Sequence, residues 1–362
     1  MVTKATPLLD DHRKLGAKLT EFAGWEMPLQ YRGVVAEHHT VRSAVGVFDV
    51  SHLGKLRVTG PSGQAALDHA LTADVGSLEP GAATYSLVLT DDGGCVDDVF
   101  VYRLGHDDWM VVPNAANVDA VAEMIASSGE NVADEWDRYA ILAIQGPASY
   151  ELVDRVWPQW RATDLKLHRF TEVDVFGERG LIARTGYTGE RGFELYAPAS
   201  TARHTFATLL DGGAEPIGLG ARDTLRLEMG YALYGHEITT DVNPLEAGLG
   251  WVLAWDTPFR GRDALEKVRA AGAERKLFAV RCVGRGVPRS GYRVLAGETP
   301  IGDVTSGNFS PTLGSGIALA LGPADRAPEI GDRVAIEARG RLIEGDIVKP
   351  PFIPRGGSGS AG

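Results

Sequence analysis

At residues 277–283 the chain reads Leu277-Phe278-Ala279-Val280-Arg281-Cys282-Val283, the first of several short, mostly apolar segments. Further segments of this kind follow at 291–295, 300–304, 316–321, 332–338 and 341–347, separated by Gly- and Pro-containing turns. Short strands at such regular spacing are typical of a small β-barrel or sandwich. We therefore predict an all-β C-terminal domain over residues 275–355, with a boundary near 272–276.

Upstream of this boundary the sequence alternates between helical and extended patterns. Leu15, Leu19 and Phe22 recur at helical spacing and predict an amphipathic helix over residues 10–22. The same reasoning predicts further helices at 34–44, 62–71, 117–127, 201–211, 221–233 and 262–271. Strands are predicted at 55–59, 109–113, 181–184 and 193–196, and a hairpin joins 85–89 to 99–103 through Asp91-Asp92-Gly93-Gly94. The predicted fold class is α+β.

The composition excludes several classes of protein. The chain has 362 residues, of which 44% are hydrophobic and 23% charged, as in globular rather than disordered proteins. With 36 Lys and Arg against 48 Asp and Glu, the formal net charge is −12. This charge argues against a broad surface for nucleic acid or anionic lipid, but it is compatible with a local basic pocket.

The chain ends and the cysteines indicate a compartment. The N-terminus leads into polar residues at 10–14 without an apolar leader, and no run approaches the roughly 20 apolar residues of a membrane span. Cys95 and Cys282 are too few for a disulfide scaffold. We therefore expect a cytoplasmic protein with reduced, mostly buried cysteines, no membrane association, and a flexible Gly/Ser tail at 356–362.

A pair of carboxylates, Asp97 and Asp98, lies in a predicted strand. Side chains alternate along a strand, so Asp98 shares a face with Phe100 and Tyr102, while Asp97 points to the opposite face. A carboxylate among aromatic rings is partly desolvated, which raises its pKa. Asp98 is therefore a candidate functional carboxylate. The alternative is a turn-end Asp that accepts backbone N–H groups.

A second candidate carboxylate, Glu194, follows the glycine-rich run Arg184-Thr185-Gly186-Tyr187-Thr188-Gly189-Glu190. On a strand, Glu194 points away from the face of Phe193 and Leu195. If that face lines a cavity, the carboxylate can accept two parallel N–H groups of a planar heterocycle. The alternative is an exposed Glu on an edge strand.

The run Gly218-Leu219-Gly220-Ala221-Arg222-Asp223 lacks the third glycine of a dinucleotide-binding loop, so we reject that interpretation. It places Arg222 in the first turn of a predicted helix, where a cation is unfavourable because of the helix dipole. Arg222 either grips an anion or is a solvated side chain paired with Asp223 or Glu228. The histidines and acidic residues show no metal-binding spacing, and no metal site is predicted.

Five blocks, in this order, resemble the aminomethyltransferase family, the T-proteins of the glycine cleavage system. They are Phe22-Ala23-Gly24-Trp25-Glu26-Met27-Pro28-Leu29, Val47-Phe48-Asp49-Val50-Ser51-His52, the runs at 184–190 and 218–223 quoted above, and Thr305-Ser306-Gly307-Asn308-Phe309-Ser310-Pro311-Thr312-Leu313-Gly314. The resemblance extends over nearly the whole chain. Several collinear blocks are far more specific than any single motif.

The resemblance implies a three-domain cloverleaf around a central folate channel. A discontinuous folate-binding α+β domain would comprise residues 1–52 and 138–250, a second α+β domain residues 53–137, and the β-barrel residues 275–355. It also implies an enzyme that moves the aminomethyl carbon from the lipoyl arm of H-protein to tetrahydrofolate, giving 5,10-methylenetetrahydrofolate and ammonia. Lipoylated H-protein would then be the partner and tetrahydrofolate the co-substrate.

Carried over by motif, the resemblance makes Asp98 the catalytic carboxylate. It assigns folate or substrate contacts to Tyr85, Asn114, Tyr187, Glu194, Arg222 and Arg355. The chain departs from some members at His168, where they have an aromatic residue near the folate. An alternative within the family is a folate-dependent demethylase acting on a small N-methyl or O-methyl substrate. A folate-binding accessory protein is a further alternative, but the Cys-containing signature of such proteins is missing here.

Overall fold

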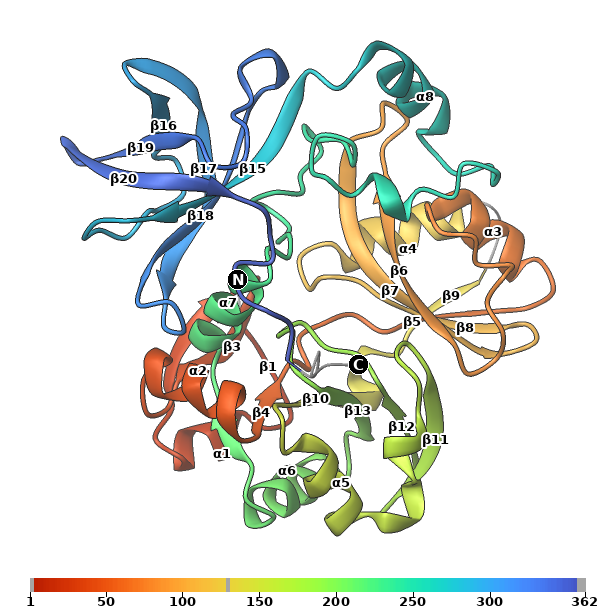
Figure 1. Cartoon of the computed structure of the whole chain (residues 1–362). Helices are drawn as coiled ribbons and strands as arrows, with labels where there is room; N and C mark the ends of the chain where they lie inside the picture. Colours follow the sequence, from red (N-terminus) through yellow and green to blue (C-terminus); the bar gives the residue numbers. More distant parts are fainter. Residues whose placement is uncertain (1–2, 128–130, 357–362) are drawn as a thin grey trace.

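A computed structural model describes residues 3–127 and 131–356. Three lobes surround the centre of the molecule in Figure 1, and a short three-stranded sheet, β1(Lys4–Ala5)-β3(Trp25–Gln30)-β2(Lys18–Phe22), lies near the N-terminus. The predicted α+β class and the C-terminal barrel are confirmed. No helix in the described ranges is long and apolar enough to cross a membrane.

The first lobe is built on a six-stranded sheet. Its order is β11(Phe170–Val175)-β12(Glu178–Ala183)-β13(Gly192–Pro198)-β10(Tyr139–Gln145)-β4(Gly46–Asp49)-β14(Glu215–Ile217), and only the β4–β14 pair is parallel. Helices α5(Ser149–Val156) and α6(Ala202–Asp211) cover one face, where Phe193 and Leu195 pack against Leu152 and Phe206. On this side the sheet is sealed by apolar contacts.

The second lobe is a five-stranded antiparallel sheet. Its order is β6(Ala83–Leu89)-β7(Cys95–Gly105)-β8(Asp108–Val112)-β5(Leu56–Thr59)-β9(Val132–Asp134). Helices α3(Gly63–Ala70) and α4(Val118–Ala126) pack on one face through residues such as Leu67 and Val121. Tyr102 and Met110 of the other face join Tyr196 of the first sheet in a common core. The two sheets therefore face each other, and residues that emerge at the margin of this core come from both.

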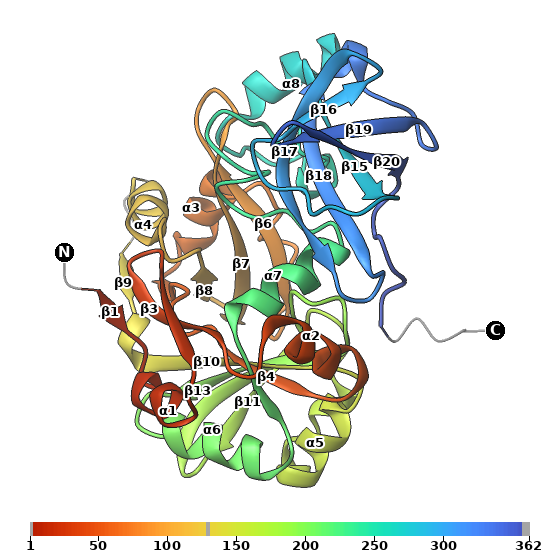
Figure 2. The same ribbon diagram turned by 90° about the vertical axis from the view of Figure 1, so that its left-hand side faces the viewer.

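Helix α7(Leu219–Glu228) lies between the lobes (Figure 2). Its Leu225 enters the common core of the two sheets, and Leu227 packs against Leu319 of the barrel. A glycine is required just before it, since a Cβ on Gly218 would lie 2.3 Å from the carbonyl oxygen of Leu29. Helices α2(Val34–Ser43) and α8(Arg262–Ala271) complete the upstream part.

The third lobe is the closed barrel β15(Arg275–Cys282)-β18(Ser315–Pro323)-β17(Thr299–Ser310)-β16(Arg293–Ala296)-β19(Arg333–Ala338)-β20(Arg341–Val348). Apolar side chains of alternate strand positions, such as Val280, Val294 and Ile336, fill its interior. The strand at 300–304 is longer than predicted, because β17 continues to Ser310.

The helix predicted over residues 10–22 is wrong. Helix α1(Leu9–Lys14) ends just before Gly16, whose φ of +74° is a left-handed conformation. The chain then forms β2, which pairs with β3 through a turn at Ala23 and Gly24. Phe22 is 41% exposed rather than on the buried face of a helix. The helix predicted at 221–233 also differs, since α7 begins at Leu219 and ends at Glu228.

The strands of the two upstream sheets come from residues 46–49 with 139–217, and from residues 56–134. The domain limits at 52/53 and 137/138 and the central folate channel stay predictions. Both Cys95 and Cys282 are buried and unpaired, as expected. Of the tail at 356–362, residues 357–362 lie outside the described residues, and the Gly356 amide donates to the carbonyl oxygen of Gly189 at 2.9 Å.

Candidate functional site

Asp98 lies on β7 and faces the six-stranded sheet. Its Oδ2 accepts a hydrogen bond from the hydroxyl of Tyr85 at 3.1 Å, and its Oδ1 accepts one from Nδ2 of Asn114 at 2.8 Å. Burial raises the pKa of Asp98. Phe100 and Tyr102 lie on the same side and pack in the common core, so the predicted face of this strand is confirmed. Three predicted residues thus form one hydrogen-bonded cluster.

The neighbouring Asp97 accepts a backbone N–H group, as the alternative interpretation expected of Asp98, but it lies within β7 and not at a turn end. Its Oδ2 accepts the backbone N–H of Asn114 at 2.9 Å, and its side chain is buried on the face toward α3 and α4. No role for Asp97 was predicted from the sequence.

Glu194 comes from β13, which lies between β12 and β10 and is therefore an interior strand. Phe193 and Leu195 are fully buried on the other face, so the predicted orientation of Glu194 is confirmed. The hydroxyl of Thr185 donates to its Oε2. Burial raises the pKa of Glu194, which the Thr185 hydrogen bond and the charge of Arg222 partly offset.

Arg222 and Arg355 are connected through two aromatic rings. The Arg222 guanidinium lies 4.8 Å from the ring centroid of Tyr187, and Tyr187 stacks on Tyr231 at 5.7 Å. Arg355 lies 5.9 Å from the ring centroid of Tyr231. Tyr187 is anchored by its hydroxyl, which donates to the carbonyl oxygen of Ala232. Two predicted arginines and one predicted tyrosine thus occur in a single row of contacts.

Arg222 is partly buried, but it forms no salt bridge with a described residue. The carboxylates that the sequence offered as partners are engaged elsewhere: Asp223 pairs with Arg226 at 2.8 Å, and Glu228 with Arg42 at 2.8 Å. Burial lowers the pKa of Arg222, and the charges of Glu194 and Asp98 oppose this effect. The charges of both candidate carboxylates therefore act on Arg222, although neither forms a salt bridge with it in the described part of the chain.

Two further side chains at this site, Trp251 and His52, were not predicted from the sequence. Trp251 of the short helix η4(Gly250–Val252) stacks on Tyr85 with centroids 5.9 Å apart, although it is 72% exposed. His52 is buried, and its Nδ1 has no hydrogen-bond partner among the described residues. Burial and the nearby Arg222 lower the pKa of His52 to about 3, so the ring is neutral. His168 is exposed, and its ring lies edge-on to that of Phe100 with the two centroids 5.5 Å apart.

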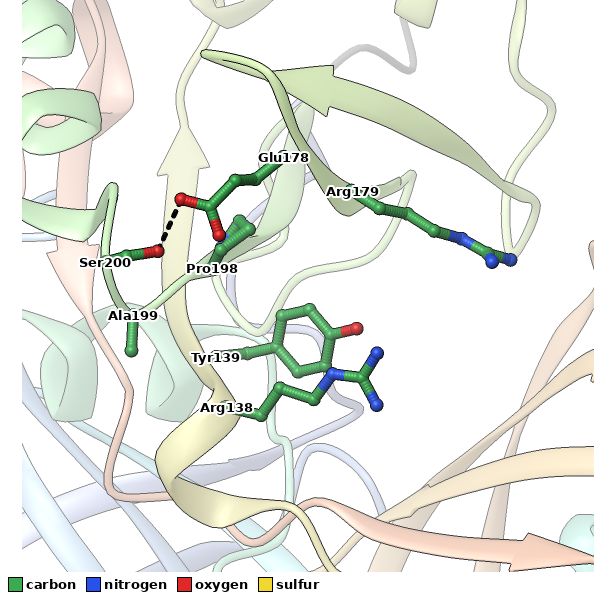
Figure 3. Close-up of a pocket in the computed structure, with 7 residues that line it drawn as sticks. All are labelled: Arg138, Tyr139, Glu178, Arg179, Pro198, Ala199 and Ser200. Atoms are coloured by element: carbon green, nitrogen blue, oxygen red, sulfur yellow. Dashed lines mark hydrogen bonds between the residues drawn. The ribbon is translucent and has the colours of Figure 1, made fainter.

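Two clefts differ in their relation to this site. One, of about 220 Å³, is bordered by Tyr85 and Trp251 and so adjoins the Asp98 cluster. Figure 3 shows a larger cleft of about 360 Å³ at one end of β10, β12 and β13. Its Arg138 and Arg179 already pair with Glu135 and Glu172, and none of the predicted site residues lines it. Of the two, only the smaller cleft is lined by a predicted site residue, Tyr85.

Two protein-family models match the chain. The model described as the GCVT N-terminal domain matches residues 8–257, and that of the glycine cleavage T-protein C-terminal barrel domain matches residues 275–353. The chain belongs to the glycine cleavage T-protein family. The second match begins where β15 begins, so the family barrel coincides with the observed one.

Curated relatives and a solved structure agree with this membership. The chain is 44% identical to the aminomethyltransferase of Mycobacterium leprae over 96% of both chains, and 43% identical to that of Halothermothrix orenii over 97% of this chain and all of the relative. The crystal structure of glycine cleavage system aminomethyltransferase T from Bartonella henselae matches with a TM-score of 0.91 at 33% identity, covering 98% of this chain and 99% of that one. The chain is an enzyme of the aminomethyltransferase family.

Proposed function

We propose that the chain transfers the aminomethyl carbon from the lipoyl arm of H-protein to tetrahydrofolate, releasing ammonia and forming 5,10-methylenetetrahydrofolate. The observation that carries the proposal is that two buried carboxylates, Asp98 and Glu194, both act by their charge on Arg222. Asp98 is held by Tyr85 and Asn114, while Glu194 faces the same region from the opposing sheet.

The residues present fit a reduced folate as substrate. Glu194 offers two carboxylate oxygens to adjacent N–H groups of the pterin ring, a bidentate arrangement. The stacked rings of Tyr187 and Tyr231 offer an aromatic surface, and Arg222 and Arg355 offer positive charge to the carboxylates of the glutamate tail. These two arginines would form a locally basic region in a chain whose net charge is −12.

Asp98 is the proposed catalytic residue. When the carbon–sulfur bond of the aminomethyl group breaks, the nitrogen lone pair forms an iminium cation, and N5 of the folate attacks its carbon. A carboxylate fixed in advance by Tyr85 and Asn114 stabilises this cation without reorganising, which water cannot do. The same group can relay protons as ammonia leaves and N10 closes the ring. Holding two large carriers together supplies a further part of the rate.

A coupled assay tests the proposal directly. Purified chain, aminomethylated H-protein and tetrahydrofolate should yield methylenetetrahydrofolate and ammonia in equal amounts. Sarcosine and a methoxy-aromatic compound serve as parallel substrates, with unlipoylated H-protein as the control. Carbon transfer from either small substrate, with none from H-protein, would contradict the proposal and indicate a demethylase.

A further inference from the structure

Asp97 is a fully buried carboxylate directly beside the proposed catalytic one. It is 0% exposed and has three hydrogen-bond donors. Its Oδ1 accepts from Nδ2 of Asn114 and from Nδ2 of Asn117, both at 2.8 Å, and its Oδ2 accepts from the backbone N–H of Asn114 at 2.9 Å. All three donors come from the segment after β8. A buried carboxylate with this many donors is a constructed feature, because burying an unpartnered one is costly.

One amide nitrogen joins Asp97 to Asp98. Nδ2 of Asn114 lies 2.8 Å from Oδ1 of Asp97 and 2.8 Å from Oδ1 of Asp98. The two side chains leave β7 on opposite faces, but Asn114 reaches both because it follows the end of the adjacent strand β8. The two carboxyl groups are therefore close neighbours in a region of low dielectric.

Little positive charge is available to this pair. Neither carboxylate forms a salt bridge with a described residue, and the charge of Arg222 of α7 lowers the pKa of Asp98. Tyr85 of β6, Cys95 of β7, Tyr187 and Tyr234 also lie near the pair and are neutral at pH 7. The charge of Glu194 of β13 acts on Arg222 together with that of Asp98, so this carboxylate adds no positive charge. Two adjacent carboxylates in such surroundings cannot both ionise easily and titrate as a unit.

The hydrogen-bond partners decide which carboxyl group holds the proton. Every partner of Asp97 is an N–H group, which can donate but cannot accept, so these contacts favour the anion. Asp98 differs, because the hydroxyl of Tyr85 can reverse its role and accept a hydrogen bond from a protonated Oδ2. Burial raises the pKa of both carboxyl groups.

We propose that Asp97 and Asp98 share one proton in the free enzyme, and that Asp97 is a positioning residue that keeps this proton on Asp98. This inference rests on the proposed function. It makes Asp98 an acid at the first step rather than a carboxylate throughout. Asp97 does not touch the substrate and acts through the charge of its neighbour.

The proton on Asp98 has a defined use. As the carbon–sulfur bond breaks, its electron pair goes to sulfur, which takes the proton from Asp98, and the resulting carboxylate faces the iminium ion. When N5 of the folate bonds to that carbon, the N5 proton returns to Asp98. In a second cycle Asp98 gives its proton to the nitrogen that leaves as ammonia, and it then takes the N10 proton as the ring closes. The two protons that the folate loses thus appear on the dihydrolipoyl sulfur and on ammonia, and no other reactant is needed.

The pH dependence of kcat/KM tests the role of Asp97. A substitution that only disturbed the structure would not be expected to shift this pH dependence in a particular direction. In Asp97→Asn the buried negative charge is gone, so Asp98 loses its proton more readily. The high-pH limb of kcat/KM should move down by about one pH unit or more. Asp97→Glu keeps the negative charge, so the high-pH limb of kcat/KM should stay at its wild-type position. Asp68→Asn is the matched control, since Asp68 also accepts backbone N–H groups in this lobe, from Val75 and Gly76, without touching Asp98.

An infrared measurement on the unmodified enzyme tests the shared proton without any Asp97 variant. At neutral pH the wild-type minus Asp98→Asn difference spectrum should show the carbonyl band of a protonated carboxyl group. Absence of that band, or an unmoved limb in a folded Asp97→Asn enzyme, overturns the inference. An enzyme that shows the band but transfers no carbon from H-protein would refute the proposed function and leave the proton pair standing.

Discussion

The guanidinium of Arg222 lies 4.8 Å from the ring centroid of Tyr187, and no described carboxylate pairs with it. A cation–π contact orients the planar group but leaves its N–H donors free. Arg222 lies in the first turn of α7, where the helix dipole disfavours a cation, so the fold places positive charge where the electrostatic potential is already positive. This position supports the proposal that Arg222 binds an anion.

Replacement of Arg222 by Lys should weaken the binding of tetrahydrofolate roughly tenfold or more, since a point charge replaces a planar fork of donors. Titration calorimetry with tetrahydrofolate measures the loss. A tetrahydropterin without the glutamate tail should bind the variant and the wild type equally. Arg179→Lys, in the cleft of Figure 3, is the control. An unchanged tetrahydrofolate affinity in Arg222→Lys would show that Arg222 does not bind the glutamate tail.

Glu194→Gln should also weaken tetrahydrofolate binding by roughly tenfold, because one of two acceptors for the pterin N–H groups becomes a donor. Burial raises the pKa of Glu194. Protonation therefore removes the acceptor at a higher pH than for an ordinary glutamate, and wild-type affinity should fall as pH is lowered through that raised pKa. Calorimetry across pH should show this fall in the wild type and a flatter response in the variant. Glu172→Gln, a surface residue paired with Arg179, should resemble the wild type.

Asp98→Asn should reduce kcat by roughly 100-fold or more while leaving tetrahydrofolate affinity unchanged, because the amide can neither neutralise the iminium ion nor relay a proton. Hydrogen bonds from Tyr85 and Asn114 hold the Asp98 side chain in the wild type, and asparagine has nearly the same shape. Single-turnover formation of methylenetetrahydrofolate at saturating folate isolates the chemical step. A near-normal rate under these conditions would exclude Asp98 as the catalytic carboxylate.

Local patterns explain which elements could be predicted from the sequence. The barrel strands and the hairpin around Gly93 alternate apolar and polar residues over short distances, and the burial of alternate positions preserves that pattern in the fold. The orientations of Asp98 and Glu194 follow from the same alternation. The error at 10–22 arose because Leu19 and Phe22 fit a helical period by chance, whereas the left-handed Gly16 separates α1 from β2.

Contacts between distant segments could not be predicted in this way. The stacking of Trp251 on Tyr85 joins η4 to β6, and the row from Arg222 to Arg355 passes through Tyr231, which no motif marked. The hydrogen-bonded link between Asp97 and Asp98 could not be predicted either. Strand alternation places them on opposite faces, and only the position of Asn114 after β8 connects them.

Glu228 is a buried carboxylate that ties three parts of the chain together. It accepts hydrogen bonds from Arg42 and His38 of α2, and from Ser310 and Thr312 of the barrel. Burial alone would raise the pKa of Glu228, but the hydrogen bonds of His38 and Ser310 and the charge of Arg42 lower it to about 2. The native state therefore stabilises the ionised form of Glu228.

Glu228→Gln should reduce the free energy of unfolding at pH 7 by about 3 kcal/mol, because Arg42 loses a buried partner. Since the native pKa of Glu228 lies below its ordinary value of 4.5, its stabilising contribution is complete above pH 4.5 and disappears as pH falls toward 2. Urea unfolding at pH 7 and at pH 3 should therefore show a smaller difference between wild type and variant at the lower pH. Glu266→Gln, which removes an exposed pair with Arg262, should change stability by less than about 0.5 kcal/mol. A difference between wild type and Glu228→Gln that is equal at both pH values would show that the residue stabilises the fold by packing rather than by its charge.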